Sequence, residues 1–288
     1  MDASPIDVFR DTLNIRFPST MPHSKVSHSI VICTYGRPES LNETLKSLEL
    51  QTFKDFEVIL LTEKGHLAQL RDDGLRASVG DVVSFIDDDV YCTPTWAESI
   101  HQAFKRKGVV GVTGPTLITE EYKRNRDVFK YRLFKRLHDV VFLGWLAKQP
   151  SHLSKCGCPS MYSNELGCKY DGPVDYLECC NMTVKRKEAI DAGGFKHEYI
   201  KTGEWAELDL SLRLSSFGSL YFSPSVALFH KPSKAGIYSA RLNTQHRWEN
   251  FMRFQKQWEG KRINRSLRTY AYRSFVWLYL KMKKNSMI

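Results

Sequence analysis

The stretch that decides the fold is Val82-Val-Ser-Phe-Ile-Asp-Asp-Asp89, a short apolar run that leads directly into three consecutive carboxylates. Turn-forming residues bound it, Gly80-Asp81 before and Thr93-Pro94 after, so we expect a buried strand. Adjacent anions repel one another, and a fold keeps three of them at a strand end mainly where a cation arrives. A hard divalent cation that holds a phosphorylated ligand fits best, because Mn²⁺ and Mg²⁺ take oxygen ligands and bridge phosphate oxygens. The alternative is an acidic turn in solvent.

The segments around this strand favour the cation site. Apolar runs and helical stripes alternate along the first part of the chain. We expect strands over 29–34, 56–61 and 109–113, and helices over 38–48, 66–78 and 96–106. This alternation predicts βαβ units and a mostly parallel sheet flanked by helices.

Three strand ends in this sheet carry polar side chains. They are Thr34–Arg37, Thr62-Glu63 and Asp87–Asp89. Ligands of open parallel sheets bind beyond the carboxyl ends of the strands. We therefore expect these segments to converge on one crevice that holds an aromatic ring, a cation and several carboxylates.

Composition restricts the partners. The 288 residues include 42 Lys and Arg against 32 Asp and Glu, a net charge of +10, which favours an anionic partner. The basic residues concentrate in 123–136 and 241–284, away from the predicted strands. No RNA- or DNA-binding motif is present, and an acidic crevice would repel a phosphate backbone, so we expect no nucleic-acid partner.

Apolar stretches near the middle and the end of the chain are short. None approaches the roughly 20 residues that span a bilayer, and no secretory signal is recognisable. We expect a cytoplasmic protein. Val140–Leu146 and Phe275–Leu280 are flanked by Lys and Arg, and predict either core helix or an interfacial segment in peripheral contact with the inner face of a membrane. We also expect an amphipathic helix over 131–145.

Five segments follow one another in a shared order. They are Ser29-Ile-Val-Ile-Cys-Thr-Tyr-Gly-Arg-Pro38, Leu70-Arg-Asp-Asp-Gly-Leu-Arg-Ala-Ser-Val-Gly-Asp81, Asp87–Asp89, Cys180-Asn-Met-Thr-Val-Lys-Arg-Lys-Glu-Ala-Ile-Asp-Ala-Gly-Gly-Phe195 and Glu207-Leu-Asp-Leu-Ser-Leu-Arg213. From about residue 28 to 232, the chain resembles the family 2 inverting glycosyltransferases of GT-A fold. The resemblance implies a Rossmann-like α/β sheet with a C-terminal helical extension.

The same resemblance implies a division of the chain. We expect an N-terminal arm over 1–25, a nucleotide-sugar-binding subdomain over 26–115, an acceptor-binding and catalytic subdomain over 116–235, and a helical extension over 236–288. Trp248, Phe251, Phe254 and Trp258 recur at near-helical intervals in the extension, which favours packing against the catalytic domain.

Roles for individual residues follow from the matching motifs. The resemblance implies donor-binding roles for Thr34, Tyr35, Arg37, Glu63, Arg71, Asp87 and Asp88. It implies metal ligation by Asp89 and His230, with Mn²⁺ or Mg²⁺ as cofactor, and acceptor-side roles for Asn181 and Trp205. Trp205 could stack on a sugar ring or pack in the core.

The catalytic base is where this chain departs from the family pattern. Ala206-Glu207 stands where Glu-Asp is usual, so Glu207 is the first candidate for the base that deprotonates the acceptor hydroxyl. Asp209 and Glu204 are the alternatives. The structural interpretation is that these residues merely form a charged helix start, since acidic residues suit helix N-termini.

These motifs imply a metal-dependent inverting transferase. It would move a sugar from a nucleoside-diphosphate donor, most often UDP in this family, to a hydroxyl of a glycan or lipid-linked acceptor. One rival is a nucleotide-sugar-binding scaffold without catalysis, which the departure at Glu207 favours. The other is a nucleotidyltransferase, against which the absence of a Gly-rich loop after the first strand argues.

Overall fold

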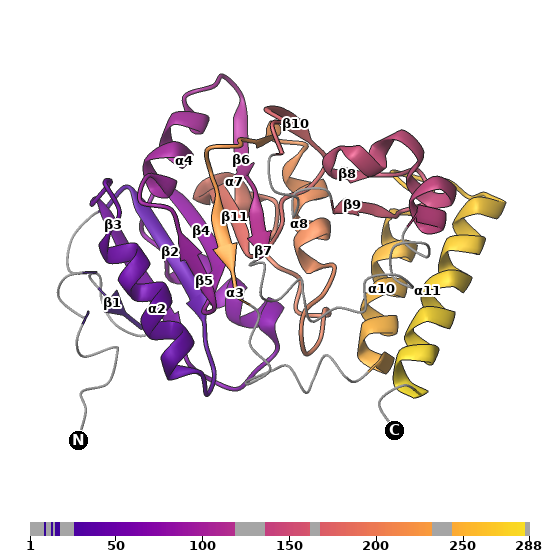
Figure 1. Cartoon of the computed structure of the whole chain (residues 1–288), viewed down its shortest axis with the longest axis horizontal. Helices are drawn as coiled ribbons and strands as arrows, with labels where there is room; N and C mark the ends of the chain where they lie inside the picture. Colours follow the sequence, from indigo (N-terminus) through magenta and orange to yellow (C-terminus); the bar gives the residue numbers. More distant parts are fainter. Residues whose placement is uncertain are drawn as a thin grey trace.

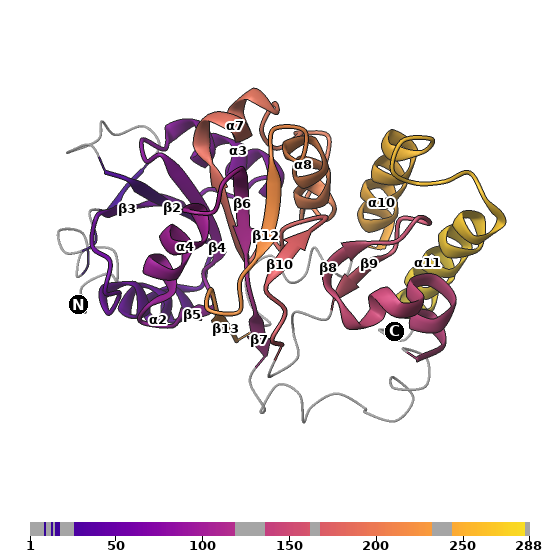
Figure 2. The same cartoon turned by 90° about the horizontal axis from the view of Figure 1, so that it is seen from above.

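An α/β body and a smaller unit beside it make up the structure (Figures 1 and 2). The computed structural model describes residues 9, 13, 15–17, 26–118, 136–161, 168–231 and 244–285. The body contains the large sheet, and the strands predicted above belong to it. The smaller unit comes from residues 136–161, coloured crimson, and from residues 244–285, coloured orange-yellow to yellow.

Eight strands form the large sheet. In spatial order they are β1 (Ile15–Arg16), β3 (Phe56–Leu61), β2 (His28–Cys33), β4 (Val82–Asp87), β11 (Asn181–Lys185), β6 (Val109–Thr113), β12 (Ser219–Phe222) and β10 (Gly172–Val174). The first four strands run parallel, as expected, and so do β6 and β12. The α/β prediction is confirmed.

The sheet is more mixed than the sequence indicated, because β11 and β10 run antiparallel to their neighbours. β11 lies between β4 and β6, with Asn181 opposite Ile86 and Lys185 opposite Val82. Several other elements separate β4 from β11 in the chain, and β11 then enters the sheet antiparallel to β4. Local sequence does not encode that direction.

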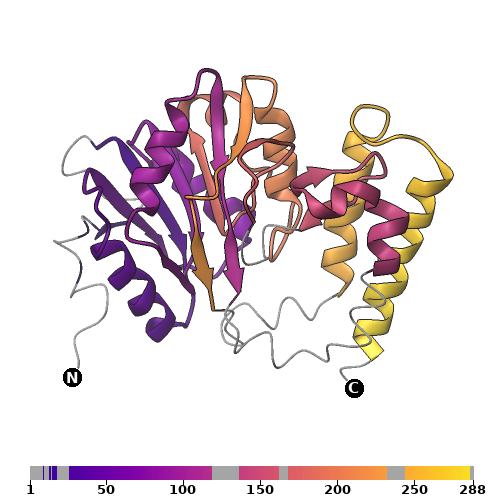
Figure 3. The same ribbon diagram turned by 45° about the horizontal axis from the view of Figure 1, so that its top comes forward.

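Helices cover both faces of the sheet (Figure 3). Their bounds are α2 (Pro38–Glu49), α3 (Leu67–Ala77), α4 (Trp96–Phe104), α7 (Arg186–Asp191) and α8 (Ala206–Leu214). Side chains that alternate along β2 explain the layers. Ile30 and Ile32 pack with α2 and α4, whereas Val31 packs with α3, α7 and α8 on the other face.

A three-stranded sheet stands at the end of β4. Its strands are β5 (Val90–Cys92), β13 (Leu228–His230) and β7 (Thr116–Ile118). β13 lies between the other two, with His230 opposite both Val90 and Ile118. This pairing carries His230 to the residue that follows the carboxylate triplet.

The described part of the N-terminal segment packs more closely than an arm would. Ile15–Arg16 extends the large sheet beside β3, and Phe9 and Leu13 are buried. Arg16 forms a buried ion pair with Glu57. These residues therefore belong to the body, and the rest of 1–25 lies outside the described residues.

The unit beside the body has its own core. It contains η1 (Asp139–Leu143, one π-helical turn), η2 (Gly144–Lys148, a 3₁₀ turn), the hairpin of β8 (Pro150–Leu153) and β9 (Pro159–Met161), α10 (Thr244–Trp258) and α11 (Leu267–Asn285). Phe251 and Phe254 of the predicted aromatic stripe are fully buried, as expected for packing. Of the helix predicted over 131–145, the residues before 136 lie outside the described part, residues 136–138 are helical, and the remainder falls in the two irregular turns.

No helix in the described ranges is both long enough and apolar enough to cross a membrane. All seven cysteines carry free thiols.

Candidate functional site

Asp88, the middle residue of the triplet, is fully buried and anchors the loop after β2. Its Oδ2 accepts hydrogen bonds from Thr34 Oγ1 at 2.5 Å and from Arg37 Nε at 3.1 Å. Burial raises the pKa of Asp88 to about 6, while the Thr34 hydroxyl and the Arg37 guanidinium oppose that rise. Asp88 thus positions the loop after β2, and its burial does not fit the expected donor-binding role.

Asp89 and His230 lie side by side, as the family resemblance implied. His230 Nε2 lies 3.0 Å from Asp89 Oδ1, and Arg37 Nη1 donates to Asp89 Oδ2 at 2.8 Å. The backbone carbonyl of Asp89 also accepts from the Lys231 amide at 2.9 Å, which ties β13 to the triplet.

Asp87, Asp89 and His230 form a metal-ligating group. One ligand atom from each lies within 4.8 Å of the others, and within the described part of the chain no other group of three acidic, Cys or His residues meets this test. Carboxylate oxygens and one imidazole suit Mn²⁺ and are accepted by Mg²⁺. The residues present therefore fit the cation that the triplet predicted, with Asp87 as an added ligand.

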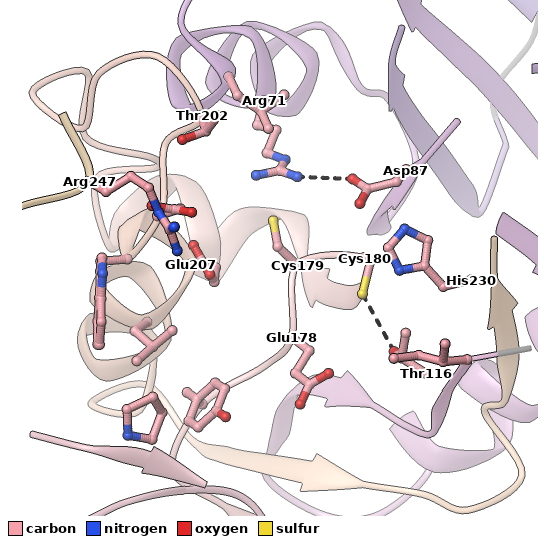
Figure 4. A pocket seen from close by; sticks show the side chains of 17 residues that line it. Arg71, Asp87, Thr116, Glu178, Cys179, Cys180, Thr202, Glu207, His230 and Arg247 are labelled. Carbon is pink, nitrogen blue, oxygen red and sulfur yellow. Dashed lines mark hydrogen bonds and ion pairs between the residues drawn. The ribbon is translucent and has the colours of Figure 1, made fainter. Parts of the chain in front are cut away.

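A cavity of about 370 Å³ opens beside this group, within the range of about 300–1,000 Å³ for small-molecule sites. Figure 4 shows Asp87 and His230 on one side of it, and Glu207 and Arg247 on the other. Arg71 of α3 lies between the two sides and donates to Asp87 Oδ1 at 3.2 Å. The cavity therefore joins the metal-ligating group to the predicted base.

Glu207 lies in the first turn of α8 and is partly buried. Burial raises the pKa of Glu207 to about 7, against the opposing charge of Arg71 and the hydrogen bond from its own backbone amide. A carboxyl group with a pKa near the working pH is suited to general base catalysis. Trp205, the residue that precedes α8, has a left-handed backbone with φ of +79°, a strained conformation that persists mainly where packing enforces it.

Of the two roles that the sequence left open for Trp205, the structure shows the core packing. Trp205 lines the cavity, and its ring also packs on Phe251 and Phe254 with centroids 5.1 Å apart in each case. Glu204 lines the same wall and accepts from Arg247 Nε at 2.8 Å. An ion pair with Arg247 makes Glu204 a weaker candidate for the base than Glu207.

The positions of Asp209 and Asn181 do not fit the expected roles of alternative base and acceptor-side residue. Neither lines the cavity, and both are fully buried. Asp209 accepts hydrogen bonds from Arg213, Gln257 and Trp258, so it fastens α8 to α10 rather than facing an acceptor. Asn181 accepts from Trp96 Nε1 at 2.9 Å and donates to the Val226 carbonyl at 2.8 Å, which is a structural role.

The remaining donor-side residues lie at the edge of the site. Thr34 and Arg37 contact the triplet, as described. Tyr35 is exposed beside them, and Glu63 is exposed at the end of β3. None of the four lines the cavity. The loop after β2 would therefore hold the nucleobase of a donor only outside this cavity.

Sequence reasoning missed several cavity residues. Thr116, Tyr176, Glu178, Cys179, Cys180 and Arg247 line it. Cys180 begins the recognised segment 180–195 and Cys179 directly precedes it, which was the available signal. Arg247 had none, because its contact with Glu204 spans 43 residues.

Comparisons with known proteins agree with this geometry. The model of the family "Glycosyl transferase family 2" matches residues 61–166. A glucosyl-dolichyl phosphate glucuronosyltransferase of Haloferax volcanii is 25% identical over 201 residues, which cover 58% of this chain and 55% of that protein. The chain thus spans about half the length of this relative.

Solved structures share the fold at low identity. TarS 1-349 of S. aureus in complex with UDP-GlcNAc is 14% identical with a TM-score of 0.55, over 90% of this chain and 73% of that chain. GalNAc-T7 with UDP, GalNAc and Mn²⁺ is 9% identical with a TM-score of 0.51, over 83% of this chain and 49% of that chain. At these identities the likeness concerns the fold.

Proposed function

We propose, from the premise that this chain belongs to glycosyl transferase family 2 and has the GT-A fold, that it transfers a sugar from a nucleoside-diphosphate donor to an acceptor hydroxyl with inversion. The observation that carries the proposal is the cavity itself. It joins Asp87 and His230 of the metal-ligating group to a single raised-pKa carboxyl, Glu207.

Asp87, Asp89 and His230 would hold Mn²⁺ or Mg²⁺. The ion, when bound, neutralises negative charge on the diphosphate oxygens. Arg37, which contacts Asp88 and Asp89, would move or share these carboxylates as the ion binds. GalNAc-T7, a structure of the same fold, was solved with UDP and Mn²⁺, and TarS with UDP-GlcNAc, which supports UDP as the donor nucleotide.

Glu207 would act as the general base. Inversion requires one group that removes the acceptor proton while the hydroxyl attacks the anomeric carbon from the face opposite the leaving group. Glu207 stands across the cavity from Asp87 (Figure 4), which supports this role. With a pKa of about 7, a substantial fraction of Glu207 is ionised at neutral pH.

Arg71 would bind the departing diphosphate. Its guanidinium already lies between Asp87 and Glu207, so negative charge that develops on the leaving group would meet a fixed cation. Arg247 would bind an anionic part of a substrate at the opposite wall, in exchange for Glu204. A phosphate of a lipid-linked acceptor has the required charge, and the Haloferax volcanii relative is named for such an acceptor.

The test incubates the purified protein and Mn²⁺ with UDP-, GDP- and dTDP-sugars and with glycosyl polyprenyl phosphate acceptors. We expect transfer from UDP donors, and a product whose anomeric configuration, read by NMR, is opposite to that of the donor. A product of retained configuration would overturn the inverting mechanism. Tight donor binding without transfer to any acceptor would instead favour the scaffold.

A further inference from the structure

Exposed apolar side chains concentrate on one part of the smaller unit. Ten of the fourteen large apolar side chains that are exposed in the described ranges lie there: Leu137, Val140, Val141, Trp145, Leu267, Tyr270, Trp277, Leu278, Tyr279 and Met282. We call this set the α11 surface. Isolated exposed apolar residues are ordinary, but a concentration of them marks an interaction site.

The spacing along α11 (Leu267–Asn285) shows that the exposure is organised. Leu267, Tyr270, Trp277 and Leu278 recur at helical intervals and lie on one side of the helix. Tyr272 and Leu280 lie on the other side and are buried. The helix is therefore apolar on two sides, and only one of them packs against the protein.

The segment 137–145 continues this surface beside α11. The Phe142 ring lies 5.1 Å from the Tyr272 ring and 5.3 Å from the Phe275 ring, which holds η1 against the inner side of α11. Val140 and Trp145, on this same segment, are each 74% exposed. Two neighbouring elements thus turn large apolar side chains toward solvent.

The charge on α11 indicates which partner fits. The sequence of the helix carries Arg268, Arg273, Lys281, Lys283 and Lys284 and no Asp or Glu. Lys281 Nζ stands 4.7 Å from the centre of the Trp277 ring, so an ammonium group and an aromatic ring share the exposed side. Trp, Tyr and apolar residues with interspersed Lys and Arg are typical of helices that lie in the interface of a bilayer.

We propose that the α11 surface docks on a bilayer that contains anionic lipids. A second copy of this chain would instead bring like charges of two α11 helices together. Docking would bring the smaller unit to the bilayer, with α10, which carries Arg247 of the cavity, packed on the inner side of α11. That orientation would serve a lipid-linked acceptor and so rests on the proposed function, whereas vesicle binding does not depend on catalysis.

Co-sedimentation with vesicles tests the proposal. The intact protein should bind vesicles of phosphatidylcholine with phosphatidylglycerol more tightly than vesicles of phosphatidylcholine alone, and added salt should weaken the binding. The double variant Trp277→Ala/Leu278→Ala should lower the partition coefficient at least about tenfold. Lys281→Glu should weaken binding to the anionic vesicles while changing binding to neutral ones little.

Phe217→Ala and Leu50→Ala provide the matched controls, because both side chains are exposed on the α/β body. They should bind vesicles as the wild type does. All variants should keep the wild-type melting temperature and the wild-type rate of hydrolysis of a water-soluble donor, so that loss of folding or of catalysis is recognised separately.

Two results would overturn the proposal. One is a wild type that stays in the supernatant with both kinds of vesicle, or a double variant that binds as the wild type does. The other is a dimer, seen by analytical ultracentrifugation, that the double variant dissociates, since the α11 surface would then be covered by a second copy.

Discussion

Arg71 Nη2 lies 3.2 Å from Asp87 Oδ1, so a cation of α3 is fixed at the carboxyl end of β4. The charge of Arg71 also lowers the pKa of Glu207, which burial alone would raise further. One guanidinium therefore acts on the metal-ligating group and on the candidate base. This relationship couples the metal-ligating group to the protonation of Glu207.

Removal of the charge at position 71 should change the pH dependence of transfer. In Arg71→Met the pKa of Glu207 should rise above about 7, because the opposing charge is lost, and the midpoint of the rate–pH profile should move to higher pH. Arg71→Lys keeps the charge and should keep the midpoint. Steady-state rates across pH measure the midpoints of both variants. An unchanged midpoint in the Met variant would show that Arg71 does not affect the pKa of the catalytic base.

Substitution of Glu207 should remove the base without removing the donor site. We expect Glu207→Gln to lower kcat by about 10²- to 10⁴-fold and to leave the Kd of the donor nearly unchanged. In the wild type, log kcat/KM should rise with pH and level off above about 7, because only the carboxylate accepts a proton. A Gln variant that keeps this profile would assign the titration to another group.

The same variant should alter stability with a defined sign. The folded-state pKa of Glu207 is raised, so the folded protein holds this proton between about pH 4.5 and 7 and loses stability as pH rises through that window. The Glu207→Gln variant has no titratable group at this position and therefore lacks this pH dependence of stability. Chemical denaturation should therefore show that the variant's stability relative to the wild type increases from pH 5 to pH 8.

Asp209 should be a structural residue, in contrast to Glu207. Its buried carboxylate accepts from Arg213, Gln257 and Trp258. Asp209→Ala leaves the Arg213 guanidinium without its carboxylate partner, and we expect it to lower the free energy of unfolding by about 3–5 kcal/mol. Urea titration measures the loss. If Asp209→Ala were as stable as the wild type but inactive, the catalytic role would have to return to this residue.

Arg37 should act as a competitor of the metal ion. It contacts both Asp88 and Asp89. We expect Arg37→Ala to lower the melting temperature without metal, because the buried carboxylate charge loses its partner, and Mn²⁺ to restore much of the loss. Calorimetry of Mn²⁺ binding without donor should give a lower Kd for the variant than for the wild type, and a higher Kd would show that Arg37 does not oppose the ion.

Local pattern explains which features the sequence could predict. The strand that ends at Asp87 and the helix stripes of α2 and α3 depend on residues that are neighbours in the chain, and periodicity reveals them. The approach of His230 to Asp89 was expected only from the family motif, since the two residues lie 141 positions apart.

The remainder depends on distant contacts that periodicity does not encode. The position of Asp209 in the chain favours it as a second candidate base, but Gln257 and Trp258, nearly 50 residues away, enclose its carboxylate. Asn181 looked acceptor-facing, but β11 turns its side chain toward Trp96. Arg247 reaches the cavity only because α10 packs on the body, and Phe251 and Phe254 pack on Trp205 there.

The most direct measurement is donor turnover with and without Mn²⁺, for the wild type and for Asp89→Ala. The account predicts that the wild type consumes a UDP-sugar with Mn²⁺ and stops in EDTA, that added Mn²⁺ restores the rate, and that Asp89→Ala is inactive in both conditions although it is folded. Turnover in EDTA at the rate seen with Mn²⁺, or metal-dependent turnover by Asp89→Ala equal to that of the wild type, would contradict it.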